Sequence, residues 1–323
     1  MRLERAAVIG AGAWGTALAQ AAAMAGRSVA LVGRDREVIE EINQRSTNSR
    51  YLGATRLSER ITAVDHLDDA ADFIILAVPA QQTRQVIASV GAHRFGDKPV
   101  VLSAKGLEAN TLKRQSEVLA EVVPDAMPFA LSGPSFAEDV AAGRPTAVTL
   151  AGDDASDTSE MAAALAGPAL RPYAADDRIG VELAGALKNI YALAAGAVEG
   201  AAFGASARSA LIARAFAEMS RFVTAMGGSH STLAGLAGLG DLTLSCTSVQ
   251  SRNYRAGIAL GRGEALPAFL AEGVATAPVA QAIAADLGVD APLVDAVNLL
   301  LSGRESIDDI VAALMARPLK KEN

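Results

Sequence analysis

Three charged residues stand where the chain could carry out proton chemistry. Lys188 lies in an apolar segment with helical spacing, Lys105 directly follows an apolar run, and Asp241 follows a glycine-rich turn. A partly buried lysine loses hydration, and a second cation nearby moves it further toward proton exchange near neutral pH. Because no histidine stands at a convincing position, Lys188 is the expected general acid, and Asp241 is expected to orient it or to hold a substrate hydroxyl. The alternative is a structural lysine that extends its ammonium group to solvent along an amphipathic helix.

A glycine-rich segment near the N-terminus could hold phosphates. Gly10, Gly12 and Gly15 form a G-x-G-x-x-G pattern directly after a short apolar run and at the start of a helix-like segment. In such a unit the first glycine permits the tight turn, the second lets the backbone approach a pyrophosphate, and the third lets the helix pack against the sheet. The helix N-terminus then offers free N–H groups to the phosphates. The pattern predicts a dinucleotide site; the alternative is a tight turn without a ligand.

The end of the second apolar run is where the ribose of a dinucleotide is read. This end reads Val32-Gly33-Arg34-Asp35. Arg34 suits a 2′-phosphate and favours NADP, whereas Asp35 suits a 2′-hydroxyl and favours NAD. We expect NADP, because Arg34 stands nearer the end of the run and its charge suits a phosphate. The alternative is that both residues are solvated loop charges.

Further candidate residues follow strand-like runs or begin helices. In an open α/β sheet the carboxyl ends of the strands line the ligand crevice, which is where the pattern places Lys105 and segment 133–135. Segment 251–253, Ser-Arg-Asn, offers a hydroxyl, a guanidinium and an amide at a predicted helix start, and these are donors that a substrate phosphate needs. The alternative is an N-cap serine followed by solvated polar residues.

Two kinds of architecture must position these residues. Up to about residue 180, short apolar runs alternate with helix-like segments, which is typical of strands buried on both faces of a parallel sheet. The strand-like runs are 6–9, 28–32, 73–78, 100–103 and 129–132, and the first helix-like segments are 14–25 and 36–44. Segments at helical spacing then cover 181–200, 206–226, 251–261, 276–286, 291–301 and 306–316. We therefore predict an α/β chain with a Rossmann-like, doubly wound, mostly parallel sheet over residues 1–180 and an all-α domain over residues 181–323.

Composition argues against several other classes of protein. The 323 residues include 51% hydrophobic but only 4% aromatic residues, and the net charge is −7 with a pI of about 5.1. An acidic chain argues against nucleic acid as a partner, because phosphate contacts need a basic surface. One cysteine, Cys246, and three scattered histidines argue against a metal site. The start of the chain is too short and glycine-interrupted for a signal peptide, and no charge-free apolar stretch reaches about 18 residues. We expect a cytoplasmic protein without a membrane span, and a homodimer is left open.

An ordered set of motifs carries a specific family resemblance. From residue 10 to about residue 292 stand GAGAWGTALA, AVPAQQTRQVI, SAKGLE, LSGPSFAEDV, ELAGALKNIYALAAG, ALIARAFAEM, LAGLGDLTLSCT and SRNYRAG. In these motifs the chain resembles bacterial NAD(P)-dependent glycerol-3-phosphate dehydrogenase. The resemblance implies a dinucleotide-binding domain followed by a helical substrate domain. It also implies an enzyme that interconverts dihydroxyacetone phosphate and sn-glycerol 3-phosphate by hydride transfer with NADP or NAD, and that supplies the backbone of phospholipids.

The resemblance also assigns roles to individual residues. The catalytic lysine of the family matches Lys188. The residues implied for the cofactor, beside the three glycines of the loop, are Ala13, Trp14, Arg34, Lys105, Ala137, Arg252, Leu270 and Glu272. The residues implied for the substrate are Lys105, Gly133, Ser135, Lys188, Asp241, Ser251, Arg252 and Asn253. Four positions depart from the family pattern: Gly53 stands where a proline usually follows Tyr-Leu, and Gly33 stands where a bulkier residue is usual. Leu270 stands where valine is common, and Ser206 stands where asparagine is common.

Two other functions are open alternatives to this enzyme. A β-hydroxyacid dehydrogenase has a related two-domain architecture, but it prefers a carboxylate substrate and does not need segment 251–253. A nucleotide-sensing module would use the glycine-rich loop without catalysis. Hydride reduction of a ketone builds negative charge on the carbonyl oxygen, which needs a donor and finally a proton. Lys105 and Lys188 favour an enzyme, because sensing needs no proton donor.

Overall fold

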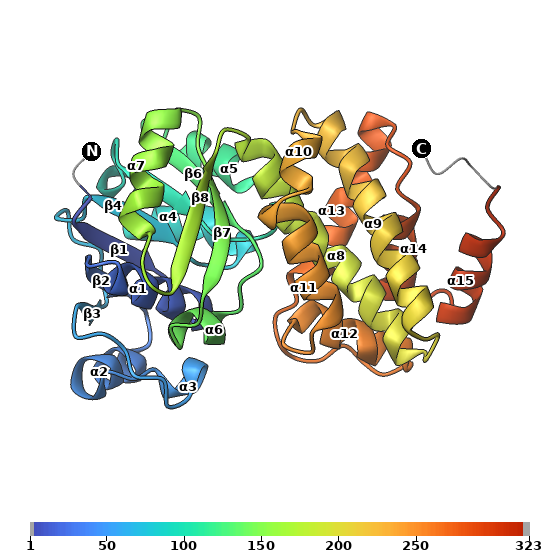
Figure 1. The fold of residues 1–323 in the computed structure, drawn as a ribbon, viewed down its shortest axis with the longest axis horizontal. Coiled ribbons are helices and arrows are strands. Elements are labelled where there is room, and N and C mark those ends of the chain that lie inside the picture. Colours follow the sequence, from blue (N-terminus) through green and yellow to red (C-terminus); the bar gives the residue numbers. More distant parts are fainter. Residues whose placement is uncertain (1–2, 319–323) are drawn as a thin grey trace.

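The molecule has two parts, an α/β domain and a helical domain, which lie side by side in Figure 1. A computed structural model describes residues 3–318, so residues 1–2 and 319–323 of the predicted domains lie outside the described part. The chain enters the helical domain at α8 (Arg178–Gly200). The predicted boundary between residues 180 and 181 falls within the first turn of this helix, which Asp177 caps by accepting a hydrogen bond from Gly180 N.

An eight-stranded sheet forms the centre of the first domain. The strands are β1 (Arg5–Ile9), β2 (Ser28–Val32), β3 (Ile61–Val64), β4 (Phe73–Leu76), β5 (Pro99–Leu102), β6 (Met127–Ser132), β7 (Thr146–Ala151) and β8 (Leu170–Ala175). Their order is β3-β2-β1-β4-β5-β6-β7-β8, and every neighbouring pair is parallel except β6 and β7. The predicted doubly wound, mostly parallel sheet is confirmed. Because the strand order reverses between β1 and β4, the loops after these strands face the crevice where such sheets bind ligands.

Alternate residues of the central strands face opposite sides of the sheet. In β4, Phe73 and Ile75 pack into the core on one face, and Ile74 and Leu76 pack into the core on the other. The first face is covered by α1 (Ala13–Met24), α6 (Ala137–Ala141) and α7 (Ala155–Leu165), and the second by α4 (Thr83–Val90) and α5 (Gln115–Val122). Burial on both faces explains why this strand is a continuous apolar run in the sequence.

The prediction missed three strands and several short helices of this domain. Strands β3 and β7 alternate buried residues with partly or fully exposed ones over much of their length, and β8 has one buried residue, Leu170, so none of the three reads as a continuous apolar run. The domain also has the helices α2 (Arg36–Arg45), α3 (Ser49–Leu52), η1 (Ala80–Gln82) and η2 (Ala92–Arg94). Of all its helices only α1 and α2 were predicted, so α4 to α7 were missed as well.

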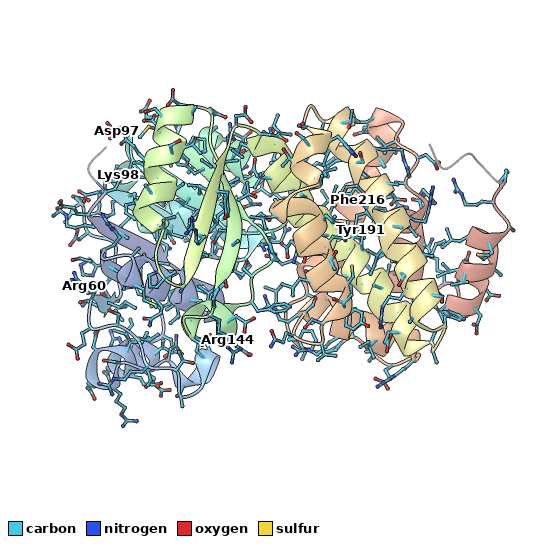
Figure 2. All side chains as sticks on the ribbon, viewed as in Figure 1. Arg60, Asp97, Lys98, Arg144, Tyr191 and Phe216 are labelled. Atoms are coloured by element: carbon cyan, nitrogen blue, oxygen red, sulfur yellow. The ribbon has the colours of Figure 1, made fainter. Side chains whose placement is uncertain are left out.

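The helical domain is built around α8. Its other elements are α9 (Ala205–Ala225), α10 (His230–Leu233), η3 (Leu236–Gly240), α11 (Asp241–Thr247), α12 (Arg252–Gly261), α13 (Glu272–Leu287), α14 (Pro292–Ser302) and α15 (Ile307–Met315). All six predicted helices are present, whereas α10, η3 and α11 were not predicted. Within residues 3–318, α8 is the one helix with the length and apolar composition of a membrane span, and 94% of its most apolar stretch is buried inside the protein. It is a core helix, and Figure 2 labels its buried Tyr191 beside Phe216 of α9.

Glycines let α8 and α12 approach each other closely. A Cβ on Gly196 of α8 would lie 2.1 Å from the carbonyl oxygen of Tyr254, and a Cβ on Gly257 of α12 would lie 2.1 Å from that of Leu193. Gly200 makes a similar approach at the next turn. No side chain fits between the two backbones, so the start of α12 has a fixed place relative to α8.

A buried carboxylate anchors α14. Glu218 on α9 is 1% exposed and accepts hydrogen bonds from the backbone N–H groups of Leu293 and Val294, at 2.9 Å each. These N–H groups belong to the first turn of α14, where a helix has no acceptors of its own and favours a negative charge. Burial raises the pKa of Glu218 to about 7, although the two N–H groups oppose this shift.

The raised pKa predicts that Glu218 makes the fold sensitive to pH. The folded protein keeps a proton that the unfolded chain releases, so the stability contributed by Glu218 falls as pH rises from 4.5 to about 7. Relative to a Glu218→Gln variant, the free energy of unfolding should fall by up to roughly 3 kcal/mol across this window. Urea unfolding of both proteins between about pH 5 and about pH 8 measures this difference. A difference that does not change with pH would contradict the assignment.

Candidate active site

The glycine-rich loop between β1 and α1 has the geometry that a pyrophosphate needs. Gly10 has a φ of +115°, and a Cβ on Gly15 would lie 1.8 Å from the carbonyl oxygen of Gly10, so the turn and the helix packing require both glycines. A Cβ on Gly12, in contrast, would meet nothing within 4 Å and would project into open space. Gly12 is also the N-cap of α1, and no side chain caps this helix. The open space and the free N–H groups fit the phosphates of a dinucleotide.

The adenosine side of this loop is bounded by the end of β2 and the start of α2. A Cβ on the buried Gly33 would lie 2.9 Å from the Cβ of Ala11, so glycine lets β2 end close against the loop. Asp35 caps α2, because its carboxylate accepts hydrogen bonds from two backbone N–H groups of the first turn at 3.0 and 3.5 Å. Arg34 is exposed, and no residue in the described part of the chain forms a hydrogen bond or ion pair with its side chain. Arg34 is therefore available to a ligand, while Asp35 is already engaged.

Three charged side chains meet at the junction of the two domains. Asp241, the first residue of α11, accepts a hydrogen bond from Lys105 Nζ at 2.7 Å and one from Lys188 Nζ at 3.0 Å. Lys105 follows β5 of the α/β domain, whereas Lys188 lies on α8. The exposed fraction of the side chain is 13% for Lys105, 10% for Lys188 and 2% for Asp241. The structure thus brings together Lys188, the expected general acid, and Lys105 and Asp241, which were expected beside it.

Burial and mutual charge set the protonation of this cluster. Burial lowers the pKa of Lys105, the Asp241 carboxylate opposes this shift in part, and the nearby Lys188 adds to it. Burial alone would raise the pKa of Asp241, but the two ammonium groups outweigh it and hold this pKa below its ordinary value. Asp241 is therefore ionised at neutral pH. With both lysines protonated, the cluster has a net positive charge, which suits an anionic ligand.

Ser245 belongs to the cluster but was not predicted. Lys188 Nζ donates a hydrogen bond to Ser245 Oγ at 2.6 Å, and Ser245 Oγ donates one to Asp241 at 3.3 Å. Ser245 lies one helical turn after Asp241 on α11, so both side chains face α8. In a helix recognised from the sequence, the spacing of four residues would have placed Ser245 beside Asp241. However, α11 is short and begins from η3, a π-helical turn without a recognisable sequence pattern.

A series of amide hydrogen bonds connects this cluster to α12 and α13. Asn189 Nδ2 donates to the carbonyl oxygen of Lys105 at 2.8 Å, and Asn253 Nδ2 donates to Asn189 Oδ1 at 2.8 Å. Asn253 Oδ1 accepts from Gly273 N at 2.9 Å. Both ends of the Asn253 amide, which was expected to contact substrate, are therefore engaged in holding three elements together.

The other predicted residues of the helical domain lie at helix starts. Ser251 is buried and caps α12 by accepting a hydrogen bond from a backbone N–H of its first turn. Arg252 is exposed, and its side chain pairs with none of residues 3–318. Glu272 Oε1 accepts a hydrogen bond from Ala80 N of the α/β domain at 3.2 Å, and Leu270 is exposed just before α13.

The remaining predicted residues surround Lys105. Lys105 Nζ donates a hydrogen bond to the carbonyl oxygen of Gly133 at 3.0 Å, and Ser135 Oγ donates to the same oxygen at 2.9 Å. The ring of Trp14 lies with its centroid 6.0 Å from Lys105 Nζ, within range of a weak cation–π interaction. The indole N–H of Trp14 is buried and has no partner among the described residues. Ala137, at the start of α6, packs against the same core as Trp14.

Cys246 lies next to the cluster but plays no chemical part in it. It is fully buried, and burial raises the pKa of its thiol to about 12. A thiol that stays protonated at neutral pH is a poor nucleophile, so Cys246 is a small buried residue, as predicted.

Comparisons with family models, with relatives in sequence and with solved structures all lead to the same family. The family models described as the N-terminus and the C-terminus of NAD-dependent glycerol-3-phosphate dehydrogenase match residues 5–158 and 177–312. Glycerol-3-phosphate dehydrogenase (NAD(P)+) of Brucella canis is 50% identical to this chain over 98% of both proteins, and that of Caulobacter vibrioides is 47% identical over 100% of both. The crystal structure of glycerol-3-phosphate dehydrogenase from Coxiella burnetii superimposes with a TM-score of 0.90 at 35% identity, over 98% of this chain and 99% of that one.

Because Gly12 and Gly15 have different surroundings, we predict that substitution of Gly12 weakens cofactor binding without lowering the stability of the fold. Gly12 has a φ of −77°, so the Cβ of a Gly12→Ala variant enters open space without backbone strain but fills the space that a pyrophosphate needs. We expect the Tm to stay within about 2 °C and the Kd for NADPH to rise at least about 10-fold. Thermal unfolding and calorimetric titration measure the two quantities.

Gly15→Ala is the matched control for this variant. Its Cβ would lie 1.8 Å from the carbonyl oxygen of Gly10, so we expect a clear loss of thermal stability. A folded Gly12→Ala protein with native affinity for NADPH would show that the loop does not hold the pyrophosphate.

Proposed function

Because this chain belongs to the NAD-dependent glycerol-3-phosphate dehydrogenase family and is thus an NAD(P)-dependent oxidoreductase, we propose that it interconverts dihydroxyacetone phosphate and sn-glycerol 3-phosphate with Lys188 as proton donor and acceptor. The resemblance seen in the sequence motifs is confirmed by the relatives. The observation that supports the role of Lys188 best is the carboxylate of Asp241, which contacts Lys188 and Lys105 within a largely buried junction. A site of this kind can bind an anionic substrate and give it a proton.

Lys188 retains one N–H for the substrate. An ammonium group has three N–H donors, and Lys188 Nζ uses one on Asp241 and one on Ser245. The third can donate to the C2 oxygen of dihydroxyacetone phosphate and give up its proton as this oxygen gains negative charge. In the reverse direction, the neutral Nζ accepts the hydroxyl proton of glycerol 3-phosphate. Bound NAD(P)H supplies the hydride.

Lys105 is a second donor with a fixed position. Two of its N–H groups are used on Asp241 and on the carbonyl oxygen of Gly133, which leaves one for a substrate oxygen. Because Lys105 is held from both sides before substrate arrives, orienting the substrate against it requires little rearrangement. Asp241 therefore fixes the positions of both ammonium groups relative to each other.

We assign the substrate phosphate to Arg252. A guanidinium binds phosphate through two parallel hydrogen bonds, and Arg252 is exposed at the start of α12, where N–H groups also favour an anion. Its neighbours fix its place, because Ser251 caps the helix and Asn253 joins it to α8 and α13.

We propose NADPH as the preferred cofactor. The loop with Gly12 offers space and N–H groups for the pyrophosphate. On the adenosine side Arg34 is available and Asp35 is engaged, so the charge offered to the ribose is positive. Glu272, at the domain junction, can accept a hydrogen bond from the nicotinamide amide.

The family also suggests a cellular role. We propose that the protein works in the cytoplasm and that its product supplies the glycerol 3-phosphate for phospholipid synthesis.

Removal of the Lys188 ammonium should separate turnover from binding. We expect Lys188→Ala to lower kcat by about 10²- to 10⁴-fold, the usual contribution of a general acid, while the Kd for NADPH stays near the native value. Steady-state rates and calorimetric titration measure the two effects. Lys98→Ala is the control, because Lys98 lies in the α/β domain far from the junction and is labelled in Figure 2. Native turnover in Lys188→Ala would exclude the proposed role.

Substrate and cofactor can be tested in one assay. We expect loss of NADPH absorbance on addition of dihydroxyacetone phosphate, with a slower reaction for NADH at the same low concentration. A β-hydroxyacid dehydrogenase would instead oxidise NADPH with a small oxo acid, or reduce NADP+ with the corresponding hydroxy acid, and would not react with the phosphorylated substrate. Binding of NADPH without any oxidation by dihydroxyacetone phosphate would favour a nucleotide-sensing module.

A further inference from the structure

We propose that Arg50 is a second determinant of NADPH specificity: together with Arg34 it binds the 2′-phosphate, and its ion pair with Asp35 masks a carboxylate that would repel this phosphate. This inference rests on the proposed function only in so far as the chain binds NADPH. The three residues come from the end of β2 and from α3, on the adenosine side of the glycine-rich loop.

The ion pair engages the carboxylate that would otherwise read an NAD ribose. Arg50 Nη1 donates a hydrogen bond to Asp35 Oδ2 at 2.6 Å, and Asp35 Oδ1 caps α2. Both oxygens of Asp35 are thus in use. A neutralised carboxylate no longer repels a phosphate, and it competes less well for a ribose hydroxyl.

The position of Arg50 is fixed by its neighbours in sequence. Asn48 Nδ2 donates a hydrogen bond to the carbonyl oxygen of Ala11, in the glycine-rich loop, at 3.1 Å. The Glu41 carboxylate accepts from the backbone N–H of Ser49 at 2.8 Å and from its hydroxyl at 3.0 Å. The backbone that carries Arg50 is therefore tied both to the loop and to α2, so a ligand in the loop meets Arg50 in a defined place.

The end of α3 is formed by Gly53, one of the positions where the sequence departs from the family pattern. Gly53 has a φ of +58°, and its N–H donates to the carbonyl oxygen of Ser49 at 3.1 Å. A proline, the usual family residue here, has a φ near −65° and no N–H, so it could not end the helix in this way. Gly53 therefore permits the last backbone hydrogen bond of the turn that carries Arg50.

Arg50 can contact a phosphate while it keeps its ion pair with Asp35. Its side chain is 62% exposed and that of Asp35 is 40% exposed, so much of the guanidinium is open to a ligand. A guanidinium has five N–H donors, so most remain available while one contacts Asp35. Arg34 and Arg50 against Asp35 leave one net positive charge, whereas Arg34 and Asp35 alone would leave none.

The test uses nucleotides that differ only in the 2′-phosphate. Adenosine 2′,5′-bisphosphate and adenosine 5′-monophosphate are titrated calorimetrically into the full-length native protein and into Arg50→Gln. We expect the Kd of the bisphosphate to rise about 10-fold or more and that of the monophosphate to change less than about 2-fold. Arg45→Gln, which removes an exposed arginine at the far end of α2, is the control and should change neither.

A double variant separates the two parts of the proposal. The double variant Asp35→Asn/Arg50→Gln lacks the carboxylate that Arg50→Gln alone leaves unmasked. Compared with Arg50→Gln, it should therefore regain the part of the affinity for the bisphosphate that was lost through repulsion, but not the part that was lost with the direct contact. No recovery would overturn the masking role, and complete recovery would overturn the direct contact. A native Kd for the bisphosphate in Arg50→Gln, or an equal loss for both nucleotides, would overturn the proposal as a whole.

These binding measurements are independent of the proposed reaction. If the native protein does not oxidise NADPH with dihydroxyacetone phosphate, the proposed function fails while the role of Arg50 can still be read from the two titrations. If the enzyme is active and Arg50→Gln binds both nucleotides as the native protein does, only the inference about Arg50 fails.

Discussion

The hydrogen bonds of one carboxylate to two lysines are the interaction on which the site depends. Asp241 contacts Lys105 from the α/β domain and Lys188 from the helical domain. Two buried ammonium groups without this partner would repel each other and keep an uncompensated cost of desolvation. The shared carboxylate therefore makes the domain junction a place where two cations can stay close together, and it sets the direction in which each points.

The rest of the helical domain serves to keep this junction rigid. The glycine contacts between α8 and α12 leave no room for side chains, so the helix with Lys188 and the helix that begins with Arg252 form one body. The amide contacts of Asn189 and Asn253 join this body to the backbone of Lys105 and to α13. Lys188, the proposed proton donor, and Arg252, the group assigned to the phosphate, thus lie on helices that are held at a constant separation, as a small substrate requires.

The sequence predicted those features that depend on local spacing. The G-x-G-x-x-G pattern, the continuous strands and the long helices could all be read, because each leaves a periodic or fixed pattern within a few residues. Ser245 was missed because its helix is short and begins from a π-helical turn. The contact between Arg50 and Asp35 was missed because it joins residues 15 apart through a four-residue helix that leaves no such pattern. Strands β3 and β7 alternate buried with more exposed residues and β8 is mostly exposed, so a search for apolar runs did not find them.

The order of the three junction residues along the chain has a consequence for biosynthesis. Lys105 and Asp241 are 136 positions apart, and Lys188 stands between them. During translation both lysines leave the ribosome before the carboxylate that neutralises them, and the α/β domain can fold before α11 exists. The junction therefore closes late, after more than two thirds of the chain has been made, and a nascent chain interrupted before Asp241 lacks the carboxylate that pairs with the two lysines.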